Sequence, residues 1–158
     1  MIYYLVGYMC CGKSTIAKEI GNKYNVKVID TDDEIEKLLG ISIKEVFDIY
    51  GEDYFRSIET IVLKQITENN DNCIVSCGGG LPCFNGNMEY INTHGISMYI
   101  KVPAEEIIRR LSSKEIEKRP ILIDKNITPF IQNQLKEREH FYNKSKYIYN
   151  ENFNFEWS

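Results

Sequence analysis

Short apolar runs alternate along this chain with longer segments in which apolar residues recur every three or four positions. The helical spacing is clear around Ile35, after Ser42, from Phe55 to Ile66 and from Pro129 to Tyr142. The runs that predict buried strands are Ile2–Val6, Val26–Asp30, Cys73–Cys77 and Ile96–Val102, with a short closing strand at Tyr147–Tyr149. Strands that alternate with helices predict an α/β fold with a doubly wound parallel sheet, covered by helices on both faces.

Polar residues and glycines indicate where several of these helices begin and end. Thr31 and Glu34 have capping-box spacing before one helix, which we expect to end at Gly40, and Ser42 and Glu45 repeat the box before the next. Pro103 is well placed as the first residue of a later helix.

One segment breaks the periodicity. Residues 112–125 are rich in charge and carry Arg119-Pro120 near the middle, which predicts a mobile flap rather than core. The rest shows no internal repeat or long linker, so we expect a single domain over residues 1–158.

Composition and charge exclude several classes of protein. The chain is 43% hydrophobic and 27% charged, with a net charge of −4, so no overall basic field is available to attract nucleic acid. No stretch approaches the ~20 apolar residues of a membrane span, and the N-terminus lacks a secretion-signal pattern. The five cysteines do not form a metal-ligand pattern, which favours reduced thiols. We expect a monomeric cytoplasmic protein without nucleic-acid or membrane partners.

The most informative motif is a phosphate-binding loop. Residues 7–14 fit G-x-x-x-x-G-K-[ST], with Gly7, Gly12, Lys13 and Ser14 at the fixed positions. The motif follows a predicted strand and leads into a predicted helix, so loop amides and the helix dipole would converge on an anion. Lys13 is expected to reach the terminal phosphates of ATP, and the Ser14 hydroxyl to bind Mg²⁺.

Two further motifs, Asp30–Asp32 and the triple glycine, fall near the expected carboxyl edge of the sheet, and a third lies on a predicted helix. Asp30 and Asp32 can divide the roles of metal ligand and proton acceptor, or can act only as favourable charges at a helix N-terminus. Arg56 and Glu59 share a helix face, where a solvated ion pair is the commoner outcome and a functional pair is the alternative. The triple glycine at residues 78–80 favours a backbone that lies against a ligand, because a plain turn needs only one or two glycines.

Taken together, these elements resemble the shikimate kinase family. The series is Gly7–Ser14, Asp30–Asp32, Phe55–Glu59, Gly78–Gly80, Arg119–Pro120 and Arg138–Tyr142, which covers nearly the whole chain. The resemblance implies a P-loop NTPase fold of the nucleoside monophosphate kinase type, with a mobile lid at about 112–125. It also implies ATP- and Mg²⁺-dependent phosphorylation of shikimate at its 3-hydroxyl, on the way to chorismate and the aromatic amino acids.

The resemblance carries roles onto individual residues of this chain. It implies that the catalytic residues are Lys13, Asp32 and Arg119, and that Ser14 and Asp30 serve the metal. Nucleotide contacts are expected from Gly7, Cys10, Cys11, Gly12, Lys13, Ser14, Thr15, Arg110 and Arg119. Shikimate contacts are expected from Asp32, Arg56, Glu59, Gly78, Gly79, Gly80 and Arg138. Arginine suits a carboxylate because its planar fork can bond both oxygens.

The chain departs from the family pattern in two places. Cys10 stands where the family usually has glycine, which is costly if the backbone there needs a positive φ. Only nine residues follow Tyr149, where relatives commonly carry a further helix, so we expect a less complete adenine pocket.

Two alternatives to an active shikimate kinase stay open at this point. One is a kinase for another small hydroxylated acid such as gluconate, against which the arginines and F-R-x-x-E argue. The other is a nucleotide-binding module without turnover, against which the retained set of lysine, aspartates and arginines argues.

Overall fold

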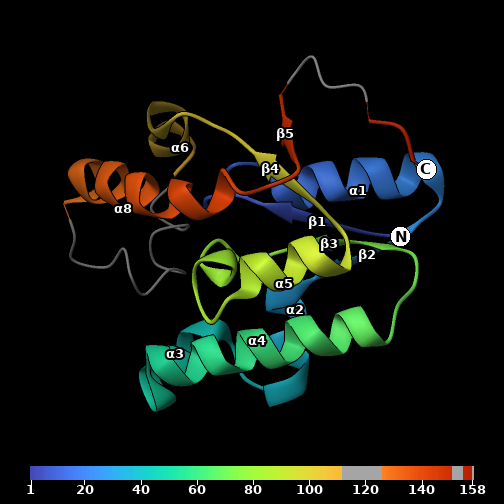
Figure 1. Ribbon diagram of the computed structural model, residues 1–158. Helices are drawn as coiled ribbons and strands as arrows, with labels where there is room; N and C mark the ends of the chain where they lie inside the picture. Colours follow the sequence, from blue (N-terminus) through green and yellow to red (C-terminus); the bar gives the residue numbers. More distant parts are fainter. Residues whose placement is uncertain (112–125, 151–154, 158) are drawn as a thin grey trace.

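The computed structural model describes residues 1–111, 126–150 and 155–157, which are drawn in colour in Figure 1. Its centre is a five-stranded parallel sheet in the order β2-β3-β1-β4-β5. The strands are β1 (Ile2–Val6), β2 (Lys27–Asp30), β3 (Cys73–Ser76), β4 (Ile96–Ile100) and β5 (Tyr147–Tyr149). The helices are α1 (Lys13–Tyr24), α2 (Thr31–Leu39), α3 (Ile43–Tyr50), α4 (Glu52–Glu68), α5 (Asn87–His94), α6 (Ala104–Arg110) and α8 (Ile127–Tyr142), with a short 3₁₀ turn, η1 (Leu81–Cys83). The predicted alternation of strands and helices is confirmed.

The central strand β1 is buried along its whole length, and its side chains alternate between two hydrophobic clusters. Ile2, Tyr4 and Val6 belong to the larger cluster, and Tyr3 and Leu5 to the smaller one. An apolar residue at every position is what a parallel strand needs when both of its faces are covered. This is why the run was recognisable as a buried strand.

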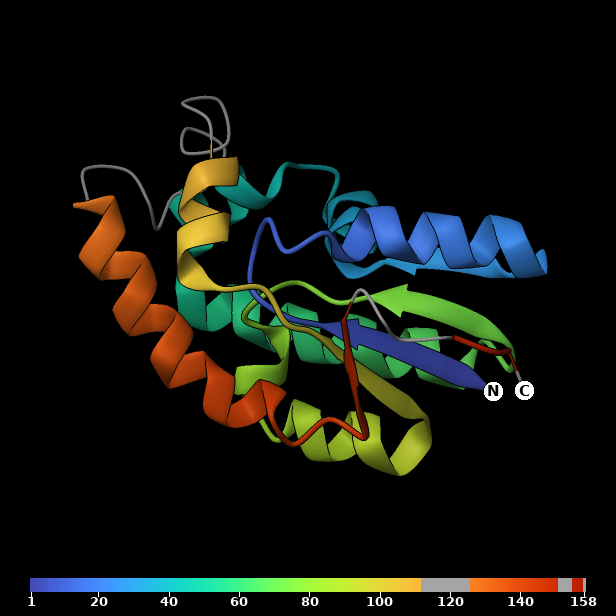
Figure 2. The same ribbon diagram turned by 90° about the horizontal axis from the view of Figure 1, so that it is seen from above.

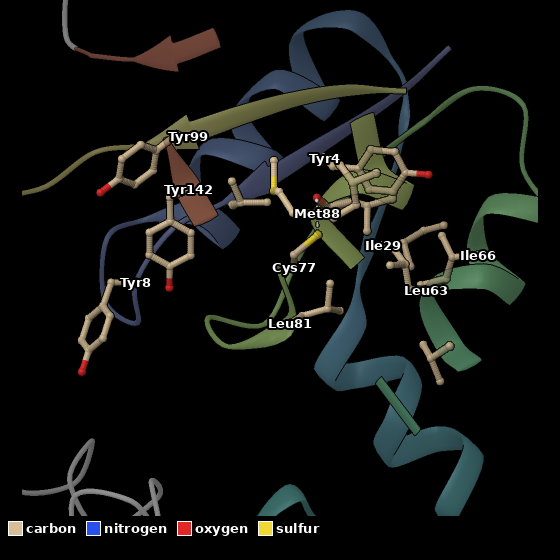
Figure 3. Close-up of a cluster of buried hydrophobic side chains, with 14 of the residues drawn as sticks. Tyr4, Tyr8, Ile29, Leu63, Ile66, Cys77, Leu81, Met88, Tyr99 and Tyr142 are labelled. Carbon is tan, nitrogen blue, oxygen red and sulfur yellow. Dashed lines mark hydrogen bonds between the residues drawn. The ribbon is translucent and has the colours of Figure 1, made fainter. Parts of the chain in front are cut away.

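Helices cover the two faces of the sheet unequally (Figures 1 and 2). Helix α1 lies on one side, whereas α4 and α5 lie on the other. The larger cluster, part of which Figure 3 shows, contains residues of α4, α5 and α8. The smaller cluster lies beneath α1 and also takes in Phe155 and Trp157, whose rings are 5.0 and 4.7 Å from the ring of Tyr3.

The carboxyl ends of four strands meet at one edge of the sheet. In the strand register Leu5 and Asp30 both pair with Ser76, and Val6 pairs with Tyr99. The residues that follow these strands therefore lie along one edge, which is where a doubly wound sheet binds its ligands.

The expected helix boundaries are partly wrong. Helix α2 is capped by Asp30, whose side chain accepts from the Asp32 and Asp33 amides, and not by a capping box at Thr31. Aspartate is a stronger N-cap than threonine, which explains the shift by one residue. The Thr31 hydroxyl instead accepts from the Gly78 amide at 2.8 Å. The end of α2 at Gly40 is confirmed.

The capping box of Ser42 and Glu45 is confirmed, with both of its hydrogen bonds present. Three other boundaries differ from the prediction by a few residues. Strand β4 ends at Ile100, and helix α8 begins at Ile127. Pro103 is the N-cap of α6 and not its first helical residue.

Helix α5 and the turn η1 were not expected. Only Asn87, Met88 and Ile91 of α5 are buried, so its amphipathic signal is weak. The predicted flap at residues 112–125, including Arg119, lies outside the described residues.

Candidate active site

The phosphate loop joins β1 to α1 and has the predicted strand–loop–helix setting. Gly7 has a φ of 151°, and a Cβ there would lie 2.8 Å from the Ile100 carbonyl oxygen. Gly12 caps α1 with a φ of 99°. Both positions require glycine on conformational grounds. Lys13, Ser14 and Thr15 follow as the first turn of α1, with their amides at the positive end of the helix dipole.

Lys13 is folded back over this loop. Its buried ammonium group donates to the carbonyls of Gly7 and Tyr8 at 2.7 and 2.9 Å. The Cys11 sulfur lies 3.5 Å from the same group and is buried beneath the loop. Cys10 is half-buried, lines the cleft and has a φ of 59°. The positive φ that would make Cys10 costly is therefore present.

Ser14 and Asp30 lie together, as the resemblance implied. The Ser14 hydroxyl donates to Asp30 Oδ2 at 3.1 Å, while Asp30 Oδ1 accepts from the Asp32 amide at 2.9 Å. One carboxylate thus faces both the phosphate loop and the start of α2. Ser76, at the end of β3, has its hydroxyl 3.4 Å from that of Ser14 and was missed by the sequence reasoning. Its position at the end of a predicted buried strand was the available signal.

Arg56 and Glu59 form a buried ion pair and not a solvated one. Arg56 Nη1 donates to Glu59 Oε1 at 2.6 Å, and the two side chains are 7% and 1% exposed. Burial raises the pKa of Glu59 to about 7, although the adjacent Arg56 charge acts in the opposite direction. Arg56 also contacts Glu52 at 3.2 Å, and its guanidinium lies 4.2 Å from the ring centre of Phe84, neither of which the sequence reasoning had assigned to the site.

The triple glycine packs against the charged groups of the site. A Cβ at Gly80 would lie 2.4 Å from Arg56 Nη1, and one at Gly78 would lie 2.9 Å from Asp32 Oδ1 and 3.1 Å from Glu59 Oε2. None of the three glycines has a positive φ. They are needed for close approach, as predicted, and not for an unusual backbone conformation.

Arg138 extends from α8 toward the same glycines. Its Nη1 lies 3.6 Å from the position of a Cβ on Gly79, and its guanidinium carbon is 5.6 Å from the ring centre of Tyr8. One helical turn further on, the Tyr142 hydroxyl donates to the Gly79 carbonyl at 2.5 Å. Burial raises the pKa of Tyr142 well above its ordinary value, so this hydroxyl stays a neutral donor.

A cleft of about 550 Å³ runs along this edge of the sheet. It is lined by Met9, Cys10, Gly12, Lys13, Ser14, Thr15, Asp30, Asp32, Ser76, Cys77, Gly78, Gly79 and Arg110. Arg110 donates to the Cys10 carbonyl at 3.1 Å, which brings a second cation to the loop. Arg56, Glu59 and Arg138 do not line this cleft but adjoin it, because Glu59 lies against Gly78, Arg138 against Gly79 and Arg56 against Gly80.

The arrangement suits transfer of a phosphoryl group. Its loop end offers amides and two cations for phosphates, and Asp32 stands between that end and the arginine-rich glycine segment. Within residues 1–111, 126–150 and 155–157, no group of three or more His, Cys, Asp or Glu side chains could hold a metal ion. No helix in that part of the chain is long and apolar enough to cross a membrane.

A family model described as Shikimate kinase matches residues 9–154. Shikimate kinase from Clostridium botulinum (strain 657 / Type Ba4) is 42% identical over 144 residues, which cover 91% of this chain and 84% of that protein. The crystal structure of shikimate kinase from Bacteroides thetaiotaomicron aligns with a TM-score of 0.87 at 35% identity and covers 95% of this chain and 86% of that one. Shikimate kinase from Acinetobacter baumannii, solved in complex with shikimate, aligns with a TM-score of 0.89 at 30% identity and covers 97% and 84%.

The family model extends from within the phosphate loop through the helices that carry Arg56 and Arg138, and the two crystal structures cover 95% and 97% of the chain. They agree with the order of motifs along the chain and with the P-loop NTPase arrangement of the fold. Because the matching stretch spans nearly all of the sequence, this chain belongs to the shikimate kinase family.

Proposed function

We propose that this protein transfers the γ-phosphate of ATP to the 3-hydroxyl of shikimate, which gives shikimate 3-phosphate and ADP in the pathway to chorismate and the aromatic amino acids. The observation that carries the proposal is the cleft in which the phosphate loop meets Asp32 and the glycines in contact with Arg56 and Arg138. The complex of the Acinetobacter baumannii relative with shikimate supports the same substrate.

The loop end of the cleft holds the nucleotide. The amides around Gly12 to Thr15 and the dipole of α1 favour the phosphate oxygens. Lys13 leaves the loop carbonyls for the terminal phosphates, an exchange that keeps its ammonium group paired. Arg110, which already contacts the loop at the Cys10 carbonyl, binds on the adenine side of the nucleotide. Cys10 and Cys11 contact the nucleotide as part of the loop. Arg119 is assigned to the phosphates, although it lies outside the described residues.

Ser14 and Asp30 fit a Mg²⁺ ion. Their oxygens are 3.1 Å apart in the cleft, and Mg²⁺ commonly uses one or two protein oxygens together with substrate phosphates and water. The absence of a three-residue metal cluster from the described residues is compatible with such a site. When bound, Mg²⁺ neutralises charge on the phosphates.

Shikimate binds where the glycine end of the cleft adjoins Arg56 and Arg138. Arg138 and Arg56 provide guanidinium groups for the carboxylate and the ring hydroxyls, and Glu59 keeps Arg56 in place. The three glycines let Asp32, Glu59 and Arg56 approach the backbone closely beside the place proposed for the ring. Several arginines around an anionic substrate are physically reasonable in a protein whose net charge is −4.

Asp32 binds the attacking hydroxyl. Its carboxylate lies beside Gly78 and lines the cleft, between the phosphate end and the arginine end. Because the transition state of phosphoryl transfer is loose, Asp32 acts as much by orienting the hydroxyl as by accepting its proton.

The proposal extends to the state of the protein, which works as a single-domain monomer in the cytoplasm.

A panel of hydroxylated acids with coupled detection of ADP tests this function. We expect turnover with shikimate and Mg-ATP and little with gluconate or quinate. Preferred turnover of another acid would reassign the substrate. Nucleotide binding without turnover of any acid would instead favour a binding module.

A further inference from the structure

Tyr8 occupies the second position of the phosphate loop, yet its side chain reaches the helix that carries Arg138. The tyrosine is 1% exposed, and its hydroxyl donates to Gln134 Oε1 on α8 at 2.5 Å. The Arg138 guanidinium carbon lies 5.6 Å from the centre of the Tyr8 ring. Gln134 and Arg138 are one turn apart on the same face of α8, so one loop side chain contacts two successive turns of that helix.

The backbone of Tyr8 belongs to the nucleotide end of the site. Its carbonyl accepts from the Lys13 ammonium at 2.9 Å, and also from the Cys11 amide at 3.3 Å. Phosphates that draw Lys13 away remove one of these two donors. The same residue therefore contacts Lys13 through its carbonyl and the helix that carries Arg138 through its side chain.

Helix α8 is held to the rest of the site by a second tyrosine. Tyr142 donates to the Gly79 carbonyl and Gln134 accepts from Tyr8, so α8 is fixed both to the triple glycine and to the phosphate loop. Figure 3 shows Tyr8 and Tyr142 in the same part of the core, on the opposite side of the view from Leu63 and Ile66. A small shift of the loop at Tyr8 therefore changes how Arg138 is presented beside Gly79.

We propose that Tyr8 is a positioning residue that couples the two substrate sites, because its hydroxyl bond to Gln134 transmits occupancy of the phosphate loop to Arg138. The inference rests on the proposed function, in which Arg138 binds the shikimate carboxylate. Coupling between two binding sites is reciprocal, so shikimate changes the affinity for nucleotide by the same factor.

The test is calorimetry of shikimate binding with and without a non-hydrolysable ATP analogue and Mg²⁺. The ratio of the two dissociation constants is the coupling factor. Tyr8→Phe keeps the ring beneath Arg138 and removes only the hydroxyl. We expect it to bring the coupling factor closer to one by about two- to tenfold, the range expected for one hydrogen bond. Gln134→Met should have the same effect, and the double variant no more than either single variant.

Tyr99→Phe is the matched control. Tyr99 is also a buried tyrosine, and its hydroxyl donates to Glu139 on the same helix at 3.4 Å, but this bond does not reach the phosphate loop. Tyr99→Phe should therefore leave the coupling factor unchanged. An equal loss in Tyr99→Phe, or no loss in Tyr8→Phe, would overturn the inference. If the wild-type protein bound shikimate with a coupling factor of one, the coupling inference would be overturned but the proposed function would stand. If the wild-type protein did not bind shikimate at all, the proposed function would be overturned as well.

Discussion

At the scale of single residues, the site contains side chains in energetically unfavourable conformations or surroundings. Cys10 has a φ of 59°, a conformation that asparagine tolerates better than cysteine. Glu59 is a carboxyl group with a 1% exposed side chain, held by Arg56 at 2.6 Å. Strain and burial of this kind concentrate at functional sites, where geometry matters more than local stability.

Cys10→Gly should increase the free energy of unfolding by about 1 kcal/mol, because it removes the cost of a left-handed conformation for a side chain with a Cβ. Urea denaturation measures the change. Asn25→Gly is the control, since Asn25 has a φ of 53° but carries a side chain suited to it. A variant less stable than wild type would show that Cys10 makes contacts worth more than the strain.

Asp32→Asn should lower kcat by about 10²–10⁴ while the affinity for ATP changes little, because the amide cannot accept the proton of the attacking hydroxyl. Steady-state kinetics together with nucleotide titration separate the two quantities. Asp33→Asn, at the neighbouring position of α2, is the control. An unchanged kcat would remove Asp32 from the mechanism.

The raised pKa of Glu59 predicts a dependence on pH near neutrality. Folding raises this pKa from 4.5 to about 7, so the folded protein retains a proton that the unfolded chain has released between these values. The contribution of Glu59 to stability is thus present below pH 4.5 and is lost as the pH rises through 7.

The same titration should affect substrate binding. Below pH 7 the neutral Glu59 carboxyl holds Arg56 less well than the carboxylate does, so KM for shikimate should rise as the pH falls from 8 to 6. Glu59→Gln should have a higher KM without this dependence, and an equally pH-dependent KM in the variant would assign the titration elsewhere.

At the scale of elements, the site depends on backbone segments that approach one another closely. The segment after β3 passes so near to α4 and α8 that a methyl group on Gly80 would meet Arg56. The Thr31 hydroxyl fixes the start of this segment through the Gly78 amide, and Tyr142 holds its middle through the Gly79 carbonyl.

Gly80→Ala should therefore raise KM for shikimate by at least about tenfold with little loss of stability. Gly80 has a φ of −87°, which alanine adopts readily, so the effect must come from displacement of the Arg56 guanidinium. Gly86→Ala is the control, because a Cβ there meets nothing within 4 Å although its φ is 68°. Kinetics and thermal unfolding compare the two variants. A tenfold effect on KM in Gly86→Ala as well would refute the specific role of Gly80.

The elements that were predictable from sequence are those with a strong local pattern. Strand β1 is apolar at every position, and the Ser42 capping box lies within four residues. The remaining features depend on contacts between distant parts of the chain. Phe84 reaches Arg56 from a loop 28 positions further along the chain, and the spacing of Arg56 and Glu59 gave no indication that the pair would be buried.

At the scale of the whole molecule, the two ends of the cleft depend on helices from opposite faces of the sheet. Helix α1 carries Lys13 and Ser14 from one face, while α4 and α8 carry Arg56 and Arg138 from the other (Figures 1 and 2). The parallel sheet brings these helices to one edge because the carboxyl ends of its strands are in register. The fold thus supplies the proximity that transfer between two bound substrates requires.

The most direct test of this account is the identity of the product. Purified protein incubated with shikimate and Mg-ATP should yield ADP and one new phosphate ester, and two-dimensional ¹H–³¹P NMR should couple its phosphorus to the proton on C3 of the shikimate ring. A phosphate on another hydroxyl, or release of ADP at the same rate without shikimate, would contradict it.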